Sequence, residues 1–159
     1  MHWLSGIGLT LVLTGSAMAQ APTVWFGSGK ISDETADGFL SHATSIITSA
    51  IDEKGRSLRP LTAEEAASPL LDRKLVKEII DVGSASAFGA ACGVDWENKN
   101  YLKLMGRERA RGGRTTHQIA AISLVHGLTM STFDPRMECR PTDKIKAETF
   151  YRRKWNGAG

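Results

Sequence analysis

Residues 70–92 form the longest stretch of the chain with the periodicity of an α-helix, and this stretch constrains the fold most. Leu71, Leu75, Ile79 and Val82 recur at steps of three or four residues, as one buried helix face requires. Such a helix needs neighbours on which to bury that face. We therefore expect a long central helix packed among other helices.

The second half of this helix carries small residues. Gly83, Ala87 and Ala91 follow one another at four-residue steps, which lets a second helix approach closely. A groove for a ligand is the alternative interpretation of the same stripe. Because glycine lowers helix stability by about 1 kcal/mol relative to alanine, Gly83 and Gly89 also predict a break or kink near the middle of the helix.

Capping signals divide the rest of the chain into further helices, with almost no strands. Two capping boxes, Thr62 with Glu65 and Thr115 with Gln118, indicate helix starts. Other starts are expected at Ser32 or Asp33, at Ser68, at Asp95, and at Thr142 or Asp143. The predicted fold is an all-α bundle of about five helices, in a single domain over residues 32–155.

The N-terminal residues 1–19 combine a short apolar run with the small residues Ala17 and Ala19, which is typical of a secretory signal cleaved before Gln20. No Lys or Arg precedes the apolar run. An uncleaved membrane anchor is the alternative. After cleavage, an irregular leader over residues 20–31 would precede the domain, and the protein would be periplasmic or secreted.

The chain has two cysteines, Cys92 and Cys139. In an oxidising compartment, two cysteines in a small domain usually pair, so we expect a disulfide that clamps the end of the central helix. A nucleophilic or metal-binding Cys92 is the alternative. Its neighbours supply no group that would stabilise a thiolate, and the two cysteines lack the C-x-x-C spacing of zinc and thioredoxin-like sites.

Carboxylates offer one route to catalysis. Asp95 and Glu97 flank Trp96 and can act as general acid and base, with His126 as a further participant. Capping and the helix dipole favour acidic residues at the same position without any catalytic role. The sequence contains no G-x-S-x-G or H-E-x-x-H motif, and "GSGK" at residues 27–30 lacks the spacing of a phosphate-binding loop.

Histidine and methionine offer a route to a metal site. His126 and Met130 lie four residues apart, and Met105 or Met137 would be needed to complete a copper site. His117 falls on the opposite side of the same predicted helix. A structural histidine beside a gap-filling methionine is the simpler interpretation, so we expect no metal and no cofactor.

Basic residues give the strongest remaining signal. The chain has 20 Lys and Arg against 17 Asp and Glu, a formal charge of +3 that is too small for a nucleic-acid-binding field but suits anionic surfaces. The candidate partner-binding residues are Arg107, Arg109, Arg111 and Arg114. Guanidinium groups suit carboxylate and phosphate partners. The alternative is a solvated helix end, where Glu108 offsets one charge.

A second basic stretch, "YRRKW" at residues 151–155, brings Trp155 as a candidate interface anchor. Together these features favour an exported, non-enzymatic helical protein that binds another protein or an anionic envelope component. A small exported hydrolase that acts on cell-wall polymer or lipid is the alternative. Its oligomeric state and the identity of the partner do not follow from the sequence.

The signal sequence generates the first prediction. Mass spectrometry of exported protein should show a chain that begins at Gln20, with or without cyclisation to pyroglutamate. Recovery of the intact chain from the cytoplasm alone would contradict export, and with it the argument for oxidised cysteines.

Overall fold

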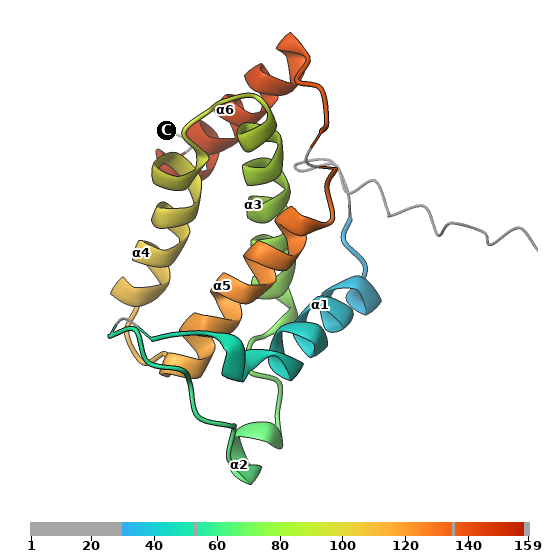
Figure 1. Ribbon diagram of the computed structural model, residues 1–159. Helices are drawn as coiled ribbons and strands as arrows, with labels where there is room; N and C mark the ends of the chain where they lie inside the picture. Colours follow the sequence, from blue (N-terminus) through green and yellow to red (C-terminus); the bar gives the residue numbers. More distant parts are fainter. Residues whose placement is uncertain (1–29, 53, 135, 158–159) are drawn as a thin grey trace, which may run out of the picture.

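The computed structural model describes residues 30–52, 54–134 and 136–157, and these residues form an all-α domain without a β-sheet (Figure 1). The predicted signal, its cleavage site and the leader up to residue 29 lie outside the described residues. The elements are α1 (Asp33–Ser45), the 3-10 turn η1 (Ile47–Ser49), α2 (Ala63–Ala66), α3 (Arg73–Ala91), the π-helical turn η2 (Glu97–Tyr101), α4 (Leu102–Ala110), α5 (Thr116–Ser131) and α6 (Pro141–Trp155).

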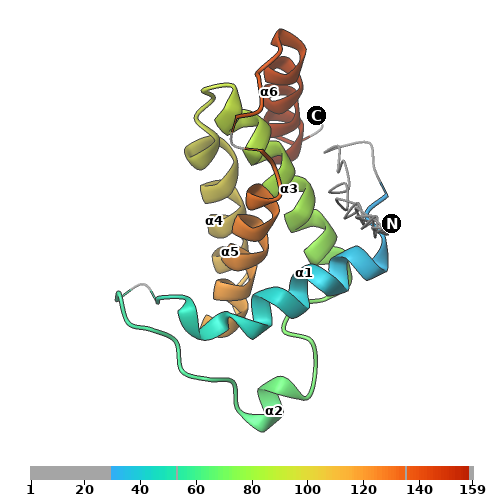
Figure 2. The ribbon, with the colours of Figure 1, turned by 45° about the vertical axis from the view of Figure 1, so that its right-hand side comes forward.

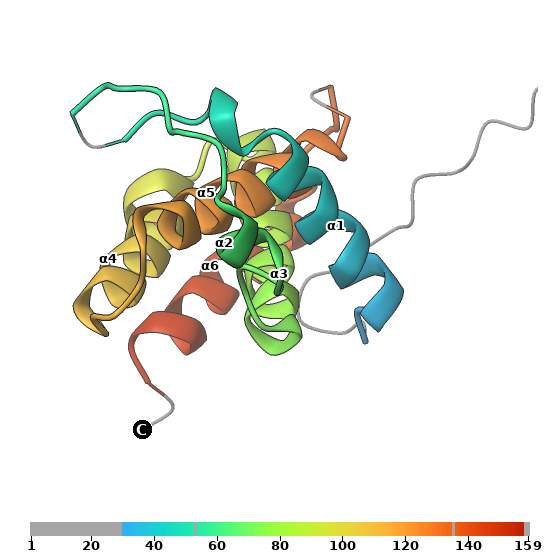
Figure 3. The same ribbon diagram turned by 90° about the horizontal axis from the view of Figure 1, so that it is seen from below.

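Three helices, α3, α4 and α5, run side by side and form the body of the domain (Figures 1 and 2). Helix α1 lies across one end of this group, and α6 packs at the other end of α3 (Figure 2). Seen from below, the single turn of α2 lies in front of the other helices (Figure 3). No helix among the described residues is long and apolar enough to cross a bilayer.

Helix α3 is central because α1, α5, α6 and η2 all contact it. It continues through Gly83 and Gly89 without a break, so of the expected break or kink the break is not formed. Close packing explains both glycines. A Cβ atom on Gly83 would lie 2.8 Å from Thr129 Cβ, and one on Gly89 would lie 2.1 Å from the hydroxyl of Tyr151.

The remainder of the small-residue stripe is not covered in the same way. Ala87 and Ala91 line an open cavity of about 600 Å³ together with Met130 and Phe133. Close helix packing is therefore confirmed at Gly83, where α3 meets α5.

Most predicted helix starts are confirmed by their hydrogen bonds. Ser32 caps α1 through a 3.0 Å bond from Thr35 N, and both capping boxes are formed. The start predicted at Ser68 is wrong, because Asp72 accepts the 2.9 Å bond from Leu75 N that begins α3. Helix α6 begins one or two residues earlier than predicted, at Pro141, whose missing N–H costs nothing in a first turn.

The turn before α4 departs from α-helical geometry. Asp95 caps it, accepting a 3.2 Å hydrogen bond from Asn98 N, and residues 97–101 then form a π-helical turn. Leu102 in this helix is 44% exposed. The inward positions belong to Leu104 and to the polar residues Asn100 and Glu108.

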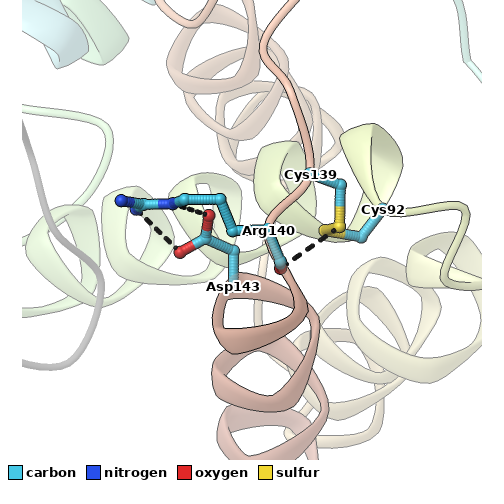
Figure 4. Close-up of a disulfide and its surroundings, with 4 residues drawn as sticks. All are labelled: Cys92, Cys139, Arg140 and Asp143. Atoms are coloured by element: carbon cyan, nitrogen blue, oxygen red, sulfur yellow. Dashed lines mark hydrogen bonds and ion pairs between the residues drawn. A yellow bond between two sulfur atoms is a disulfide. The ribbon is translucent and has the colours of Figure 1, made fainter.

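The predicted disulfide is formed between Cys92, at the C-terminus of α3, and Cys139, just before α6 (Figure 4). The two Cα atoms are 4.9 Å apart. Next to the bridge, the Arg140 guanidinium forms two hydrogen bonds of 2.7 and 3.0 Å with Asp143, which orders the first turn of α6 (Figure 4). The bridge ties the start of α6 to the end of α3.

The disulfide generates the second prediction. Cys92→Ser and Cys139→Ser should each lower the free energy of unfolding by about 2–5 kcal/mol, and the double variant should match either single one, because one bridge is lost in all three. Chemical denaturation of the purified protein measures this. Alkylation of both cysteines in the unreduced, folded protein would contradict it.

Candidate functional site

The four candidate arginines do not form one solvated group. Arg107, Arg111 and Arg114 all bind Glu108, whose side chain is fully buried in the described structure. The hydrogen bonds to its two oxygens are 2.9 Å from Arg107 Nε, 3.0 Å from Arg111 Nη1 and 2.8 Å from Arg114 Nε. Glu108 therefore binds three cations, whereas the sequence alone predicts that it offsets one.

A second carboxylate, Glu78 on α3, connects α4 to α6. It accepts hydrogen bonds from Arg107 and forms a 2.6 Å ion pair with Lys154. Burial alone would raise the pKa of Glu78, but its hydrogen bonds to Arg107 and Lys154 outweigh burial and hold the pKa below its ordinary value. The Arg107 guanidinium also lies over the Trp155 ring, 5.4 Å from its centroid. Arg107 of α4 thus contacts both α3 and α6.

Arg109 and Arg114 face a concave surface between α4, α5 and the loop that follows η1. This surface encloses about 450 Å³, and we call it the basic pocket. Its lining includes four cationic side chains and one carboxylate, namely Lys54, Arg56, Arg109, Arg114 and Asp52. Arg109 is exposed, and the Arg114 side chain is 20% exposed. The structure therefore brings together two of the four arginines predicted from the sequence.

Apolar and hydroxyl groups complete the basic pocket. Met105, Ile119 and Ala120 contribute apolar surface. Tyr101 and Ser123 contribute hydroxyl groups that are joined by a 2.7 Å hydrogen bond. The pocket thus combines cations with apolar and hydrogen-bonding groups.

The loop at the edge of the pocket is ordered by Asp52. Its carboxylate accepts hydrogen bonds from the backbone N–H groups of Lys54 and Arg56, at 2.8 and 2.9 Å, and from the Arg56 guanidinium, at 2.8 and 2.6 Å. These hydrogen bonds lower the pKa of Asp52 to about 2. A β-bridge between Ile51 and Ser57 closes the loop, and Ile51 is 68% exposed beside the pocket.

The interior of the domain contains a polar network that the sequence does not predict. Asn100 donates from Nδ2 to Ser86 Oγ and to the carbonyl of Val82, both at 2.9 Å. Its Oδ1 accepts a 2.8 Å bond from the Trp155 indole, and Ser86 Oγ is 3.0 Å from His126 Nε2. The small size of Ser86 and the position of Asn100 in a polar helical turn were the only sequence signals for this network.

The 3.0 Å distance between Ser86 Oγ and His126 Nε2 is the distance expected of a serine nucleophile and its base. The surroundings of the pair do not fit that role. Both residues are buried, and neither lines any of the five main cavities of the described structure. His126 is also packed against the rings of Trp96 and Tyr101, with centroids at 6.0 and 4.7 Å. The pair joins α3 to α5 in the interior of the domain.

The carboxylates considered for catalysis lie elsewhere. Asp95 and Glu97 are exposed at the start of η2, and Asp95 is engaged with Asn98. Neither shares a described cavity with His126. His126 Nε2 already contacts Ser86, and no group of three or more His, Cys, Asp and Glu in the described ranges is arranged to hold a metal ion. The "GSGK" stretch falls almost wholly outside the described residues.

The Glu108 cluster generates the third prediction. Glu108→Gln should lower the free energy of unfolding by about 3 kcal/mol, at the low end of the range for broken buried pairs, because its arginines keep partial contact with water. Arg111→Gln should cost at most about 1 kcal/mol, since that side chain is 54% exposed and its pairing is screened by solvent. Urea denaturation of both variants measures the difference; equal costs would contradict a specific role for buried Glu108.

His126 generates the fourth prediction. Burial lowers its pKa from 6.5 to about 4, so between these values the unfolded chain binds a proton that the folded chain does not. The free energy of unfolding should therefore decrease as the pH falls through this window, by about 3 kcal/mol in all. His126→Gln should remove this contribution, and His42→Gln on the exposed face of α1 should retain it. Identical pH dependence in both variants would contradict the assignment.

Comparison of the chain with known protein families, with curated protein sequences and with solved structures gives no match. The functional conclusions therefore depend on the residues of this chain and on their geometry.

Proposed function

We propose that this protein is an exported, non-enzymatic helical domain that binds an anionic partner, either a protein or an envelope component, at the basic pocket. The observation that carries the proposal is the charge of the pocket, whose described lining includes four cationic side chains and one carboxylate. That carboxylate, Asp52, is occupied by its own loop. An incoming carboxylate or phosphate would therefore meet a surplus of positive charge.

The shape of the pocket supports recognition of a group rather than attraction to a flat surface. Apolar side chains and the Tyr101 and Ser123 hydroxyls lie between the cations, so a partner that inserts an acidic group also gains apolar contact and hydrogen bonds. The Asp52 hydrogen bonds order the loop before any partner arrives, which lowers the entropic cost of binding. Ile51 offers an exposed apolar contact at the rim.

Export is part of the proposal, and two observations support it. The apolar run and small residues at the N-terminus have the pattern of a cleaved signal. The Cys92–Cys139 disulfide fits an oxidising compartment. A hydrolase receives no comparable support, because Asp95 and Glu97 lie at the surface and His126 is enclosed in the interior.

The basic pocket generates the fifth prediction. A Lys54→Gln/Arg109→Gln double variant should lose most capture of partner from periplasmic extract, because it removes two exposed cations of the pocket. Its thermal unfolding should stay close to wild type, since exposed ion pairs contribute only about 0–1 kcal/mol. Quantitative capture at several salt concentrations measures the effect, which salt should weaken in the wild type.

The matched control is Lys74→Gln/Lys144→Gln, which removes the same charge from exposed positions on α3 and α6, outside the pocket. This control should capture the partner as the wild type does. Equal losses in both double variants would mean that only net charge matters, and undiminished capture by the pocket variant would refute the assigned site.

A further inference from the structure

A second cavity, on the opposite side of the helical segment 97–110, is independent of the basic pocket. It encloses about 350 Å³ between η2, the first turn of α4 and the C-terminal part of α6, and we call it the α4–α6 cavity. It shares no lining residue with the basic pocket. The residues that carry the argument are Lys99, Lys103, Glu148, Tyr151, Arg152 and Trp155.

The cations of this cavity differ from the candidate arginines in their partners. Lys99 and Lys103 are exposed and four residues apart, and neither forms an ion pair with any residue in the described ranges. Arg152 reaches the cavity from α6, and the hydrogen bond found for its guanidinium is a 3.3 Å contact with Thr149. Like charges at this helical spacing repel one another, so the fold itself gains nothing from this arrangement.

The aromatic wall of the cavity is fixed from behind. The Trp155 indole N–H donates to Asn100 Oδ1 at 2.8 Å, and the Tyr151 hydroxyl donates to the carbonyl of Ala85 at 2.8 Å. Both hydrogen bonds anchor the rings to residues of the domain interior. A ligand that packs against these side chains therefore finds them already ordered, which reduces the entropic cost of binding.

The net charge of the cavity lining favours a doubly charged anion over a singly charged one. Three cations face one carboxylate, Glu148, whose charge lies close enough to Tyr151 to add to the rise in the pKa of the phenol that burial mainly causes. The lining thus has a formal surplus of two positive charges. A phosphate monoester carries a charge of about −1.5 to −2 at neutral pH, which matches this surplus, whereas a single carboxylate neutralises half of it.

We propose that the α4–α6 cavity binds a small ligand that carries a phosphate monoester on a ring. Lys99, Lys103 and Arg152 would hold the phosphate through charge-assisted hydrogen bonds, and the ring would pack against Trp155 and Tyr151. A cavity of 350 Å³ is at the small end of the range of ligand sites, which suits one ring with its phosphate. The proposal does not depend on the partner proposed for the basic pocket.

The test uses three defined probes: inorganic phosphate, phenyl phosphate and glucose 6-phosphate. Nuclear magnetic resonance of the mature, disulfide-bonded protein follows the indole N–H of Trp155 during each titration. At least one ring-bearing probe should shift this signal saturably and bind more tightly than inorganic phosphate. The better ring-bearing probe identifies the ring as aromatic or sugar.

Two double variants distinguish binding in this cavity from general electrostatic attraction of anions. Lys99→Gln/Lys103→Gln should weaken the tighter probe by about tenfold or more, because it removes two charge-assisted contacts of the stronger class of hydrogen bond. Lys74→Gln/Lys144→Gln loses the same charge at exposed positions outside the cavity and should bind as the wild type does. The remaining backbone signals report that each variant is folded.

Any of three results would overturn the proposal. The first is a Trp155 signal that does not saturate with any probe, and the second is that neither ring-bearing probe binds more tightly than inorganic phosphate. The third is equal weakening of binding by Lys99→Gln/Lys103→Gln and by Lys74→Gln/Lys144→Gln. Because neither lysine of the cavity lines the basic pocket, loss of partner capture and loss of phosphate binding can be observed separately.

Discussion

The close contact of α3 with α5 at Gly83 sets the arrangement on which the rest of the domain depends. With no side chain at Gly83, the backbone of His126 and the side chain of Thr129 lie directly against α3. This proximity lets Ser86, one turn further along α3, reach His126 across the interface. At the other end of the helix, Gly89 makes room for the Tyr151 hydroxyl of α6. Two glycines thus allow the close approach of α5 and of α6 to the central helix.

Buried hydrogen bonds fix the positions of the residues that line the basic pocket and the α4–α6 cavity. Asn100 bonds Ser86 on one side and Trp155 on the other, so it connects α3 and η2 to the last residue of α6. Buried polar groups are costly unless they are satisfied, and each of these hydrogen bonds favours one arrangement of the helices. Tyr101, which follows Asn100 in the π-helical turn, faces the basic pocket, and Trp155 faces the α4–α6 cavity. One turn therefore positions a wall of each cavity.

The fold could be predicted where the determinants are local. Capping by Ser32 and the two capping boxes depend on residues three positions apart, and the disulfide followed from the expected compartment. The inward direction of Asn100 and Glu108 could not be predicted, because a hydrophobic pattern assigns polar residues to the surface. Their burial depends on partners 14 residues away in the case of Ser86, and on guanidinium groups that fold back over Glu108. Neither cavity could be located from the sequence, since each joins elements that are distant along the chain.

The ion pairs also show why a count of basic residues is a poor guide to a binding site. Arg107, Arg111 and Arg114 belong to a basic stretch of the sequence, yet the buried carboxylate of Glu108 binds all three. Lys99 and Lys103 belong to no dense basic stretch, and no carboxylate of the described chain pairs with them. An exposed cation without an internal partner contributes little to folding and retains its full charge for a ligand. Binding capacity on this surface therefore follows the cations that the fold leaves uncompensated.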